Sequence, residues 1–391
     1  MTCFFLTFDP SLGFIKRILS IEFFNKIFSW LGLFSYPWLT YLLLALVAAL
    51  IVVGIMSAFG IFAVWMERKV SAFMQCRLGP MEVGGFHGWA QTIADGIKLL
   101  SKEDLIPKAA DKPLFIIAPI LAFVGVFMAF VVIPFDSSLI VADLNVGLFF
   151  FLAMFGIEAI GVLMAGWASN NKWSLFGSLR LVAQLVTYEI PLGITVLTIA
   201  TIAGSLSVQD ICLAQTETTG SITLFSWYIF RNPFMWILFL VFFTATLAEC
   251  KRAPFDLPEA ESELVSGFHT EYSGMRFSVF FLSEYAAMYL VSCMISILFF
   301  GGWSVGIAAI DHSESFGAVL LRIGALNLKA LFFVFVQMWL RWTLPRIRLD
   351  QVMYCCLKVL LPLSLFSFIG ATVWEFFFRG NFFGVMKTLL T

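Results

Sequence analysis

The chain has 391 residues, of which 61% are hydrophobic and 13% are charged, and its formal net charge is −1. Soluble domains carry about 25% charged residues, so this composition excludes an ordinary soluble protein. There is neither a net positive charge nor a basic tail, and we expect no nucleic-acid partner.

Long apolar runs recur along the sequence and predict membrane-spanning helices. A bilayer core of about 30 Å needs roughly 20 apolar residues in a helix. The runs do not alternate residue by residue, as the strands of a transmembrane β-barrel do. We therefore predict an all-α integral membrane protein with an eight-span domain at 39–378. The predicted spans are 39–65, 113–134, 147–167, 184–203, 233–249, 279–302, 324–344 and 355–377.

An N-terminal extension, residues 1–38, precedes the first span and mixes basic side chains with many Phe and Ile. It lacks the compact basic segment, single apolar core and cleavage site of a signal peptide. We predict an interfacial helix here, with a ninth span as the alternative. A short tail, 379–391, ends the chain.

The loop predicted at 66–112 contains an amphipathic segment, "GWAQTIADGIKLLSK", at 88–102. At 100° per residue its polar and apolar side chains fall on opposite faces, which predicts a helix in the membrane interface. Two functions stay open, an anchor on the membrane surface and the lip of an entrance for a lipid-soluble ligand. The polar face holds Gln91, Asp95, Lys98 and Lys102, and the apolar face holds Trp89, Ile93, Ile97 and Leu100.

Lys and Arg concentrate in the odd-numbered loops between the predicted spans, whereas the second loop has none and the fourth and sixth hold only Arg231 and Arg322. By the positive-inside rule the odd loops face the cytoplasm, or a mitochondrial matrix or chloroplast stroma. Both termini then lie on the opposite side, the periplasmic side in a bacterium. The bacterial inner membrane is favoured, with the mitochondrial inner membrane and the thylakoid as alternatives.

Ionisable residues also lie inside the apolar runs. A charge in a bilayer is costly unless it faces a polar interior, so such residues indicate either a structural pair or a functional path. Arg180, Gln184 and Tyr188 form a polar stripe that leads into the fourth span. Such a stripe is typical of a helix face that lines another helix or a wet channel. The residues within the runs are Glu158, Glu189, Glu284 and Lys329.

The stretch "ECKRAPFDLPEAESELVSGFHTE", within an acidic loop predicted at 249–278, gathers six carboxylates. Acids near the start of a helix are common because they complement its dipole, so one or two have an ordinary explanation. Six neighbouring carboxylates repel one another when ionised, which favours a hydrated cavity or a proton path. Asp256, Glu259 and Glu263 are expected on one helical face. The six acids are Glu249, Asp256, Glu259, Glu261, Glu263 and Glu271.

Near the C-terminal end, "RWTLPRIRLDQ" places three arginines beside a proline that breaks a helix. They are either a positive-inside anchor or partners for the acids of the fifth loop, through Arg346 or Arg348. The seven Cys form no C-x-x-C pair, so we expect no iron–sulfur cluster or metal on this chain. The three His lie outside the apolar runs, which excludes a bis-His haem buried between the spans. No nucleotide-binding glycine motif is present, so a nucleotide site is not supported.

Together these segments resemble one family, the quinone-chamber membrane subunit of respiratory complex I, known as the NADH dehydrogenase subunit 1 family. The main signatures are "GWAQTIADGIKLLSKED" at 88–104 and "RAPFDLPEAESELVSGF" at 252–268. "MERKVSAFMQCRLGP", "GWASNNKWSLFGSLRLVAQLVTYEIP" and "LRWTLPRIRLDQ" match further family segments in order. The resemblance covers nearly the whole chain beyond about residue 38. Cys250 and Lys251 depart from it, because members often carry other polar residues there.

The resemblance implies a subunit of a proton-pumping NADH:quinone oxidoreductase that forms the tunnel by which quinone enters from the lipid. Quinone is then the substrate, and flavin and iron–sulfur clusters belong to partner subunits of the membrane and peripheral arms. The residues implied to line or brace the tunnel are Arg68, Gln75, Arg77, Asp95, Lys98, Arg252, Phe255, Asp256, Arg341 and Arg346. Those implied for the proton path are Glu158, Glu189, Glu249, Glu259, Glu261, Glu263, Glu271 and Glu284.

Three other functions stay open. A related quinone- or hydrogenase-type ion-translocating complex shares this architecture, and its neighbouring genes would distinguish it. A standalone ion transporter predicts paired halves with broken helices, which the sequence does not show. A purely structural anchor has no use for acids inside its spans.

Overall fold

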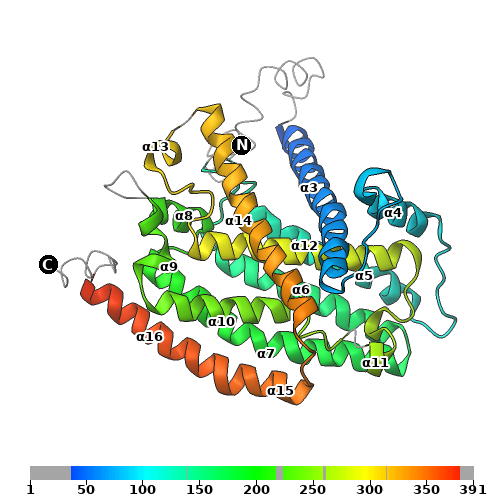
Figure 1. The fold of residues 1–391 in the computed structure, drawn as a ribbon. Coiled ribbons are helices and arrows are strands. Elements are labelled where there is room, and N and C mark those ends of the chain that lie inside the picture. The colour runs from blue at the N-terminus through cyan, green and yellow to red at the C-terminus, as the bar shows by residue number, and fades with distance from the viewer. Residues whose placement is uncertain (1–36, 138, 217–222, 259–260, 314, 379–391) are drawn as a thin grey trace.

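The computed structural model describes residues 37–378, apart from residues 138, 217–222, 259–260 and 314 (Figure 1). Within these residues the chain is helical, with one isolated β-bridge between Asp136 and Leu139 and no strand. The predicted all-α class is confirmed. The predicted interfacial helix and the C-terminal tail lie outside the described residues.

Seven helices of the described chain are long and apolar enough to cross a bilayer. The remaining predicted span corresponds to α10, whose 16 residues reach roughly 24 Å, less than the bilayer core. Length alone therefore does not confirm a count of eight. Six of the seven are α3 (Pro37–Met74), α5 (Lys112–Ala129), α6 (Gly147–Ala168), α7 (Lys172–Ala203), α12 (Gly274–Phe299) and α14 (Phe316–Thr343). The seventh consists of α15 (Leu349–Tyr354), a π-helical turn (Cys355–Leu360) and α16 (Leu361–Phe378), and the shorter α10 spans Phe234–Glu249. The short helices are α4 (Gln91–Ser101), α8 (Val208–Thr216), α9 (Tyr228–Arg231), α11 (Glu261–Leu264) and α13 (Ala308–Asp311).

Several helices are longer than predicted. α3 continues to Met74 instead of ending at residue 65, so the first loop begins later than expected. α7 begins at Lys172, where the Asn171 side chain caps it by accepting a hydrogen bond from a backbone N–H in the first turn. α14 likewise begins at Phe316. The added turns carry polar side chains such as Glu67, Arg180 and Arg322, which find partners inside the protein. Hydropathy alone therefore ends α3 too early and starts α7 and α14 too late.

α12 runs through the middle of the bundle and contacts α3, α5, α10 and α14 (Figure 1). Its most apolar window is 89% buried, against 28% for α14. α5 and α6 pack backbone to backbone. A Cβ on Gly161 would lie 2.6 Å from the Ala122 nitrogen, and one on Gly125 would lie 2.9 Å from the Glu158 nitrogen. This close approach requires glycine and fixes Glu158 against α5.

The loops gather at two ends according to their order in the chain. Among the odd loops, Asn170 donates a hydrogen bond to the Ala109 carbonyl at 3.1 Å. Among the even loops, Gln209 donates to the Ser137 carbonyl at 2.9 Å. This arrangement agrees with the predicted alternation. The side of the membrane that each end faces stays a prediction.

Candidate functional site

Arg252 lies at the centre of a buried charged cluster near the odd-loop end of the bundle. Its Nη1 lies 3.1 Å from Glu67 Oε2, and its Nε lies 2.8 Å from Glu284 Oε1. The Tyr285 hydroxyl donates to Glu67 at 2.6 Å, and Arg341 pairs with the other Glu67 oxygen at 2.6 Å. The Tyr285 ring also packs 4.4 Å from the guanidinium. One guanidinium thus joins carboxylates from α3 and α12.

A sharp turn after α10 places these charges. Lys251 adopts a left-handed backbone conformation, with φ of 56°, directly after the helix end. Lys251 and Arg252 donate their backbone N–H groups to Ala248 and Leu247, and both side chains are buried. Burial opposes the charge of Arg252, but the Glu284 and Glu67 carboxylates outweigh it and raise its pKa well above the ordinary value. Arg252 therefore stays charged.

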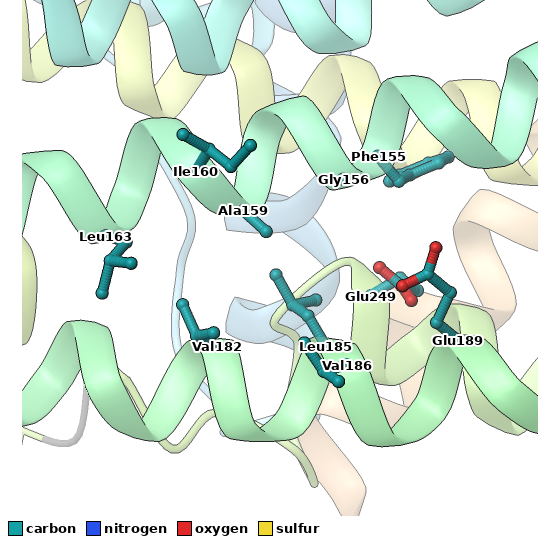
Figure 2. Close-up of a pocket in the computed structure, with 10 residues that line it drawn as sticks. All are labelled: Phe155, Gly156, Ala159, Ile160, Leu163, Val182, Leu185, Val186, Glu189 and Glu249. Carbon is teal, nitrogen blue, oxygen red and sulfur yellow. The ribbon is translucent and has the colours of Figure 1, made fainter.

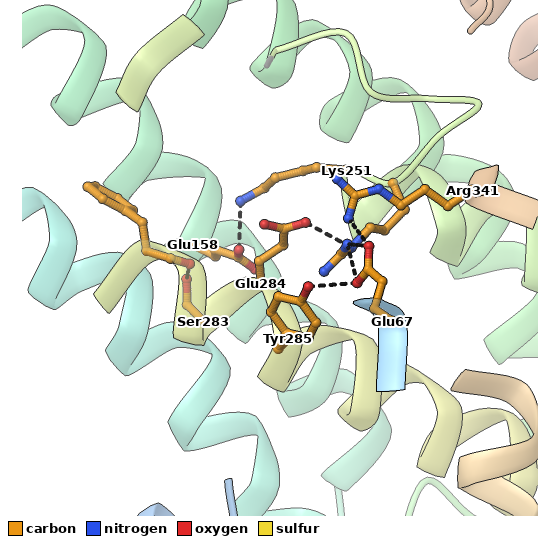
Figure 3. Close-up of polar contacts among 9 residues, drawn as sticks. Glu67, Glu158, Lys251, Ser283, Glu284, Tyr285 and Arg341 are labelled. Carbon is orange, nitrogen blue, oxygen red and sulfur yellow. Dashed lines mark hydrogen bonds and ion pairs between the residues drawn. The ribbon is translucent and has the colours of Figure 1, made fainter. Parts of the chain in front are cut away.

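A second buried ion pair lies beside the first. Lys251 Nζ lies 2.8 Å from Glu158 Oε1, and their side chains are only 5% and 3% exposed. The ammonium also lies 5.7 Å from the centre of the Phe268 ring. Figure 3 shows Lys251 reaching to Glu158 next to Glu284.

A cavity of about 150 Å³ lies between α6 and α7, and Glu189 and Glu249 stand at one end of it (Figure 2). Glu249, the last residue of α10, is buried, whereas Glu189 is exposed in the isolated chain. The volume is enough for a few waters, at about 30 Å³ each. The other residues of the wall are apolar: Phe155, Gly156, Ala159, Ile160, Leu163, Val182, Leu185 and Val186.

A larger pocket, of about 290 Å³, lies between α3, α4 and α12. Arg68 Nη2 pairs with Asp95 Oδ2 at 2.6 Å, and Lys98 Nζ lies 3.9 Å from Asp95 Oδ1. Tyr285 also lines this pocket, so its hydroxyl connects the pocket wall to the buried Arg252 cluster. The pocket's remaining lining is mostly apolar: Ser57, Gly60, Ile61, Val64, Thr92, Gly96, Leu99, Phe277, Ser278, Phe281 and Leu282.

The predicted amphipathic helix is confirmed as α4. Its apolar face is open in this chain, with Ile97 62% and Leu100 66% exposed, and Trp89 precedes the helix with its ring exposed. Its polar face carries Asp95 and Lys98 to the pocket. α4 therefore has an open apolar face and also lies at the rim of a cavity, and its two alternative functions stay predictions.

Seven predicted tunnel residues do not line this pocket. Arg252 and Arg341 belong to the buried cluster and Arg346 binds Glu263, whereas Gln75, Arg77, Phe255 and Asp256 lie elsewhere. Gln75 accepts a hydrogen bond from Arg77 at 2.7 Å in the loop after α3. Phe255 packs in the core, with its ring 5.3 Å from that of Tyr188. Asp256 is half-buried in the turn before α11. The structure does not bring these four together with Arg68 and Asp95.

The acidic stretch occupies several separate places. Glu263 binds both Arg180, at 2.5 Å, and Arg346, which confirms the predicted link from Arg346 to the fifth loop. Glu271 accepts a hydrogen bond from Asn171 at 2.7 Å. The expected shared helical face is wrong for Asp256, which lies outside α11. Glu259 and the side chain of Glu261 lie outside what the structure describes.

Acidification should open the link that Glu263 forms. Hydrogen bonding from Arg180, together with the nearby Arg346, lowers the pKa of Glu263 below its usual 4.5. The stabilising contribution is therefore fully present above pH 4.5 and is lost as the pH falls through the lower folded-state value. Hydrogen exchange of the backbone at 263–268 should accelerate below that pH. The variant E263Q should exchange fast at every pH, and equal protection in both proteins would contradict this role.

The other predicted polar groups have structural partners. Gln184 donates to the Ala248 carbonyl at 2.8 Å and Tyr188 to the Val352 carbonyl at 3.0 Å, so the polar stripe lines neighbouring helices. Lys329 donates to the backbone carbonyls of the loop after α12 and lies 4.1 Å from the Trp227 ring. It holds the even-loop end together, away from the Arg252 cluster.

Sequence reasoning missed three residues of the site: Glu67, Lys251 and Tyr285. Ending the first span at residue 65 assigns Glu67 to a loop, although helix α3 carries it into the interior. Lys251 departs from the family pattern, but the sequence alone gives it no role. Tyr285 directly follows Glu284 on α12, and an intramembrane tyrosine beside an acid is the signal that identifies it.

The described residues contain no group of three or more His, Cys, Asp and Glu that could hold a metal ion. An apolar pocket with a few polar groups at one side instead suits a neutral, lipid-soluble ring with polar oxygens.

Comparison with known proteins gives a consistent result. The sequence profile described as NADH dehydrogenase matches residues 46–372. The chain is 52% identical to the H subunit of the NADH-quinone oxidoreductase of Chlorobaculum tepidum, over 87% of this chain and 94% of that protein. It is 47% identical to the protein of the same name from Bacillus cytotoxicus, over 90% of this chain and 97% of that one.

Proposed function

The chain belongs to the NADH dehydrogenase family, and on this premise we propose that it forms the quinone chamber of an NADH-quinone oxidoreductase and links quinone reduction to proton translocation. Like its relatives it is a membrane subunit of that enzyme and assembles with other subunits. Flavin and iron–sulfur groups on partner subunits would deliver the electrons. The relatives named above are bacterial, which supports the bacterial inner membrane as its location.

The pocket between α3, α4 and α12 is the observation that carries this proposal. Its largely apolar wall suits a quinone, and the exposed apolar face of α4 beside it suits a lipid surface. Arg68, Asp95 and Lys98 form a charged rim that would orient a polar headgroup. Arg341 would act one step further in, through its ion pair with Glu67.

Tyr285 supports the link from quinone to protons, because it belongs to both the pocket wall and the Arg252 cluster. Reduction of a quinone to a quinol consumes two electrons and two protons. A change of charge in the pocket acts on Glu67 and Glu284 through Arg252 at short range and in a poorly hydrated interior, where electrostatic interactions are strong. We assign the onward proton path to Glu249 and Glu189, with the carboxylate of Glu158 beside them. The acids Glu259, Glu261, Glu263 and Glu271 would form the approach to this path from the odd-loop end.

Filling the pocket should impair quinone binding. The variant S57W places an indole ring in a cavity of about 290 Å³. We expect the apparent KM for a short-chain quinone to rise about tenfold, with a smaller change in kcat, because the loss is one of binding. Steady-state kinetics of the assembled complex measure this.

The matched control is L50W, on the same helix, because Leu50 is 62% exposed and does not line the pocket. Its KM should remain that of the unchanged protein. A normal KM in S57W, or the same increase in both variants, would show that quinone does not use this pocket.

A further inference from the structure

Lys251 places a positive charge beside a row of three acids, Glu158, Glu249 and Glu189, which we call the acid row. Its Nζ is 2.8 Å from Glu158 Oε1, and both side chains are almost fully buried. Glu249 lies within electrostatic range of Glu158, Glu189 and Lys251. Glu249 and Glu189 share the cavity between α6 and α7 (Figure 2). The ammonium therefore contacts Glu158, the acid of the row that does not line the cavity.

The backbone at Lys251 is shaped for this placement. Its φ of 56° lies in the left-handed region, which costs free energy for any residue with a Cβ and which helix ends usually fill with Gly or Asn. A lysine here gains nothing from solvent, because its side chain is buried. The ion pair with Glu158 is an interaction that helps to offset the unfavourable conformation.

Charge balance gives Glu158 a role different from that of the other acids. A carboxylate buried without a cation takes up a proton, because burial disfavours its charged form. Other charged groups near Glu158 and Lys251 are Glu249 on α10, Glu189 on α7 and the Arg252–Glu284 pair. Arg252 is already bound to Glu67 and Glu284, so Lys251 is the cation that contacts Glu158 directly.

We propose that Lys251 is a positioning residue that keeps Glu158 ionised, so that protons entering the acid row during quinone turnover reside on Glu249 and Glu189. The turnover part rests on the proposed function, whereas the charge state of Glu158 does not. Glu158 then supplies a fixed negative charge that attracts protons into the cavity. Removal of the Lys251 charge should move a proton onto Glu158 and weaken that attraction.

The test compares four variants of the assembled complex, K251N, K251R, E158Q and the double variant K251N/E158Q. Asn suits the left-handed turn, so K251N removes the charge without straining the backbone. The first readout is the C=O stretch of a protonated carboxylic acid in the infrared spectrum. Relative to the unchanged protein, an additional band should appear in K251N, and neither K251R nor the double variant should show it.

The second readout is coupled quinone turnover in proteoliposomes. It should fall about tenfold in K251N, in E158Q and in the double variant, and stay within about twofold of normal in K251R. Normal turnover in K251N, or no new band in an assembled K251N complex, would overturn the inference. If K251N does not assemble, the double variant K251N/E158Q tests the inference instead, because it buries no unpaired charge. Normal turnover in the double variant would also overturn the inference. A further variant, E249Q, separates this inference from the proposed function. If E249Q loses turnover but K251N shows no new band, the proposed function stands and only this role of Lys251 is removed.

Discussion

Replacement of Arg252 by methionine should prevent stable assembly of the complex. Arg252 is 2% exposed and binds Glu67 and Glu284, so R252M leaves two buried carboxylates without their main cation. Removal of one partner from a buried ion pair costs about 3–5 kcal/mol. That is a large part of the 5–15 kcal/mol by which a typical folded domain is stable. Native gel electrophoresis and thermal unfolding of the purified complex measure the loss.

Arg276 offers a control, since it is an arginine of the same end of the bundle that pairs with a single carboxylate. Its Nη2 lies 3.0 Å from Asp104 Oδ2, but both side chains reach solvent. Exposed pairs contribute about 0–1 kcal/mol, so R276M should assemble normally. R252K should only partly restore stability, because an ammonium lacks the planar fork that engages two carboxylates. If R252M and R276M prove equally stable, the cluster has no stabilising role.

Replacement of Glu249 by glutamine should abolish proton translocation while leaving the fold intact. Glu249 is buried at the end of the cavity that Glu189 also lines, and glutamine keeps its size and hydrogen bonding but carries no titratable proton. We expect coupled turnover to fall by at least about tenfold, in line with the usual loss when a proton-transferring group is removed. Proton uptake and quinone reduction, measured together in proteoliposomes, give the result.

The variant E375Q is the control, because Glu375 is also a helical, partly buried glutamate but pairs with Arg231 at the even-loop end. It should pump protons normally. Full pumping in E249Q would exclude Glu249 from the path, and equal losses in both variants would indicate a general structural effect.

The sequence predicts the parts of this protein that depend on local pattern. Hydropathy locates the helices, and the 3.6-residue period identifies α4 with the correct apolar face. The acids within apolar runs are recognised from the sequence because placing a charge in a bilayer costs free energy unless the charge has a polar partner. Two of these, Glu158 and Glu284, do form buried ion pairs. Arg346 is correctly paired with the fifth loop, because opposite charges there face the same end.

The partners of these charges could not be predicted, because they depend on tertiary contacts. Glu67 and Arg252 lie 185 residues apart in sequence. Lys251 turns inward only because the chain leaves α10 through a left-handed residue, which hydropathy does not reveal. The six acids of the fifth loop look like one cluster in sequence, but the turn buries Glu249 and leaves Glu263 at the surface.

The separation of Glu67 from Arg252 also constrains biosynthesis. Since 185 residues lie between them, a ribosome adding about 5–20 residues per second needs roughly 10 to 40 s to supply the arginine after the glutamate. During that interval α3 has neither Arg252 nor Arg341 to neutralise its acid. The end of α3 that carries Glu67 can therefore take up its buried place only after the later helices have been made.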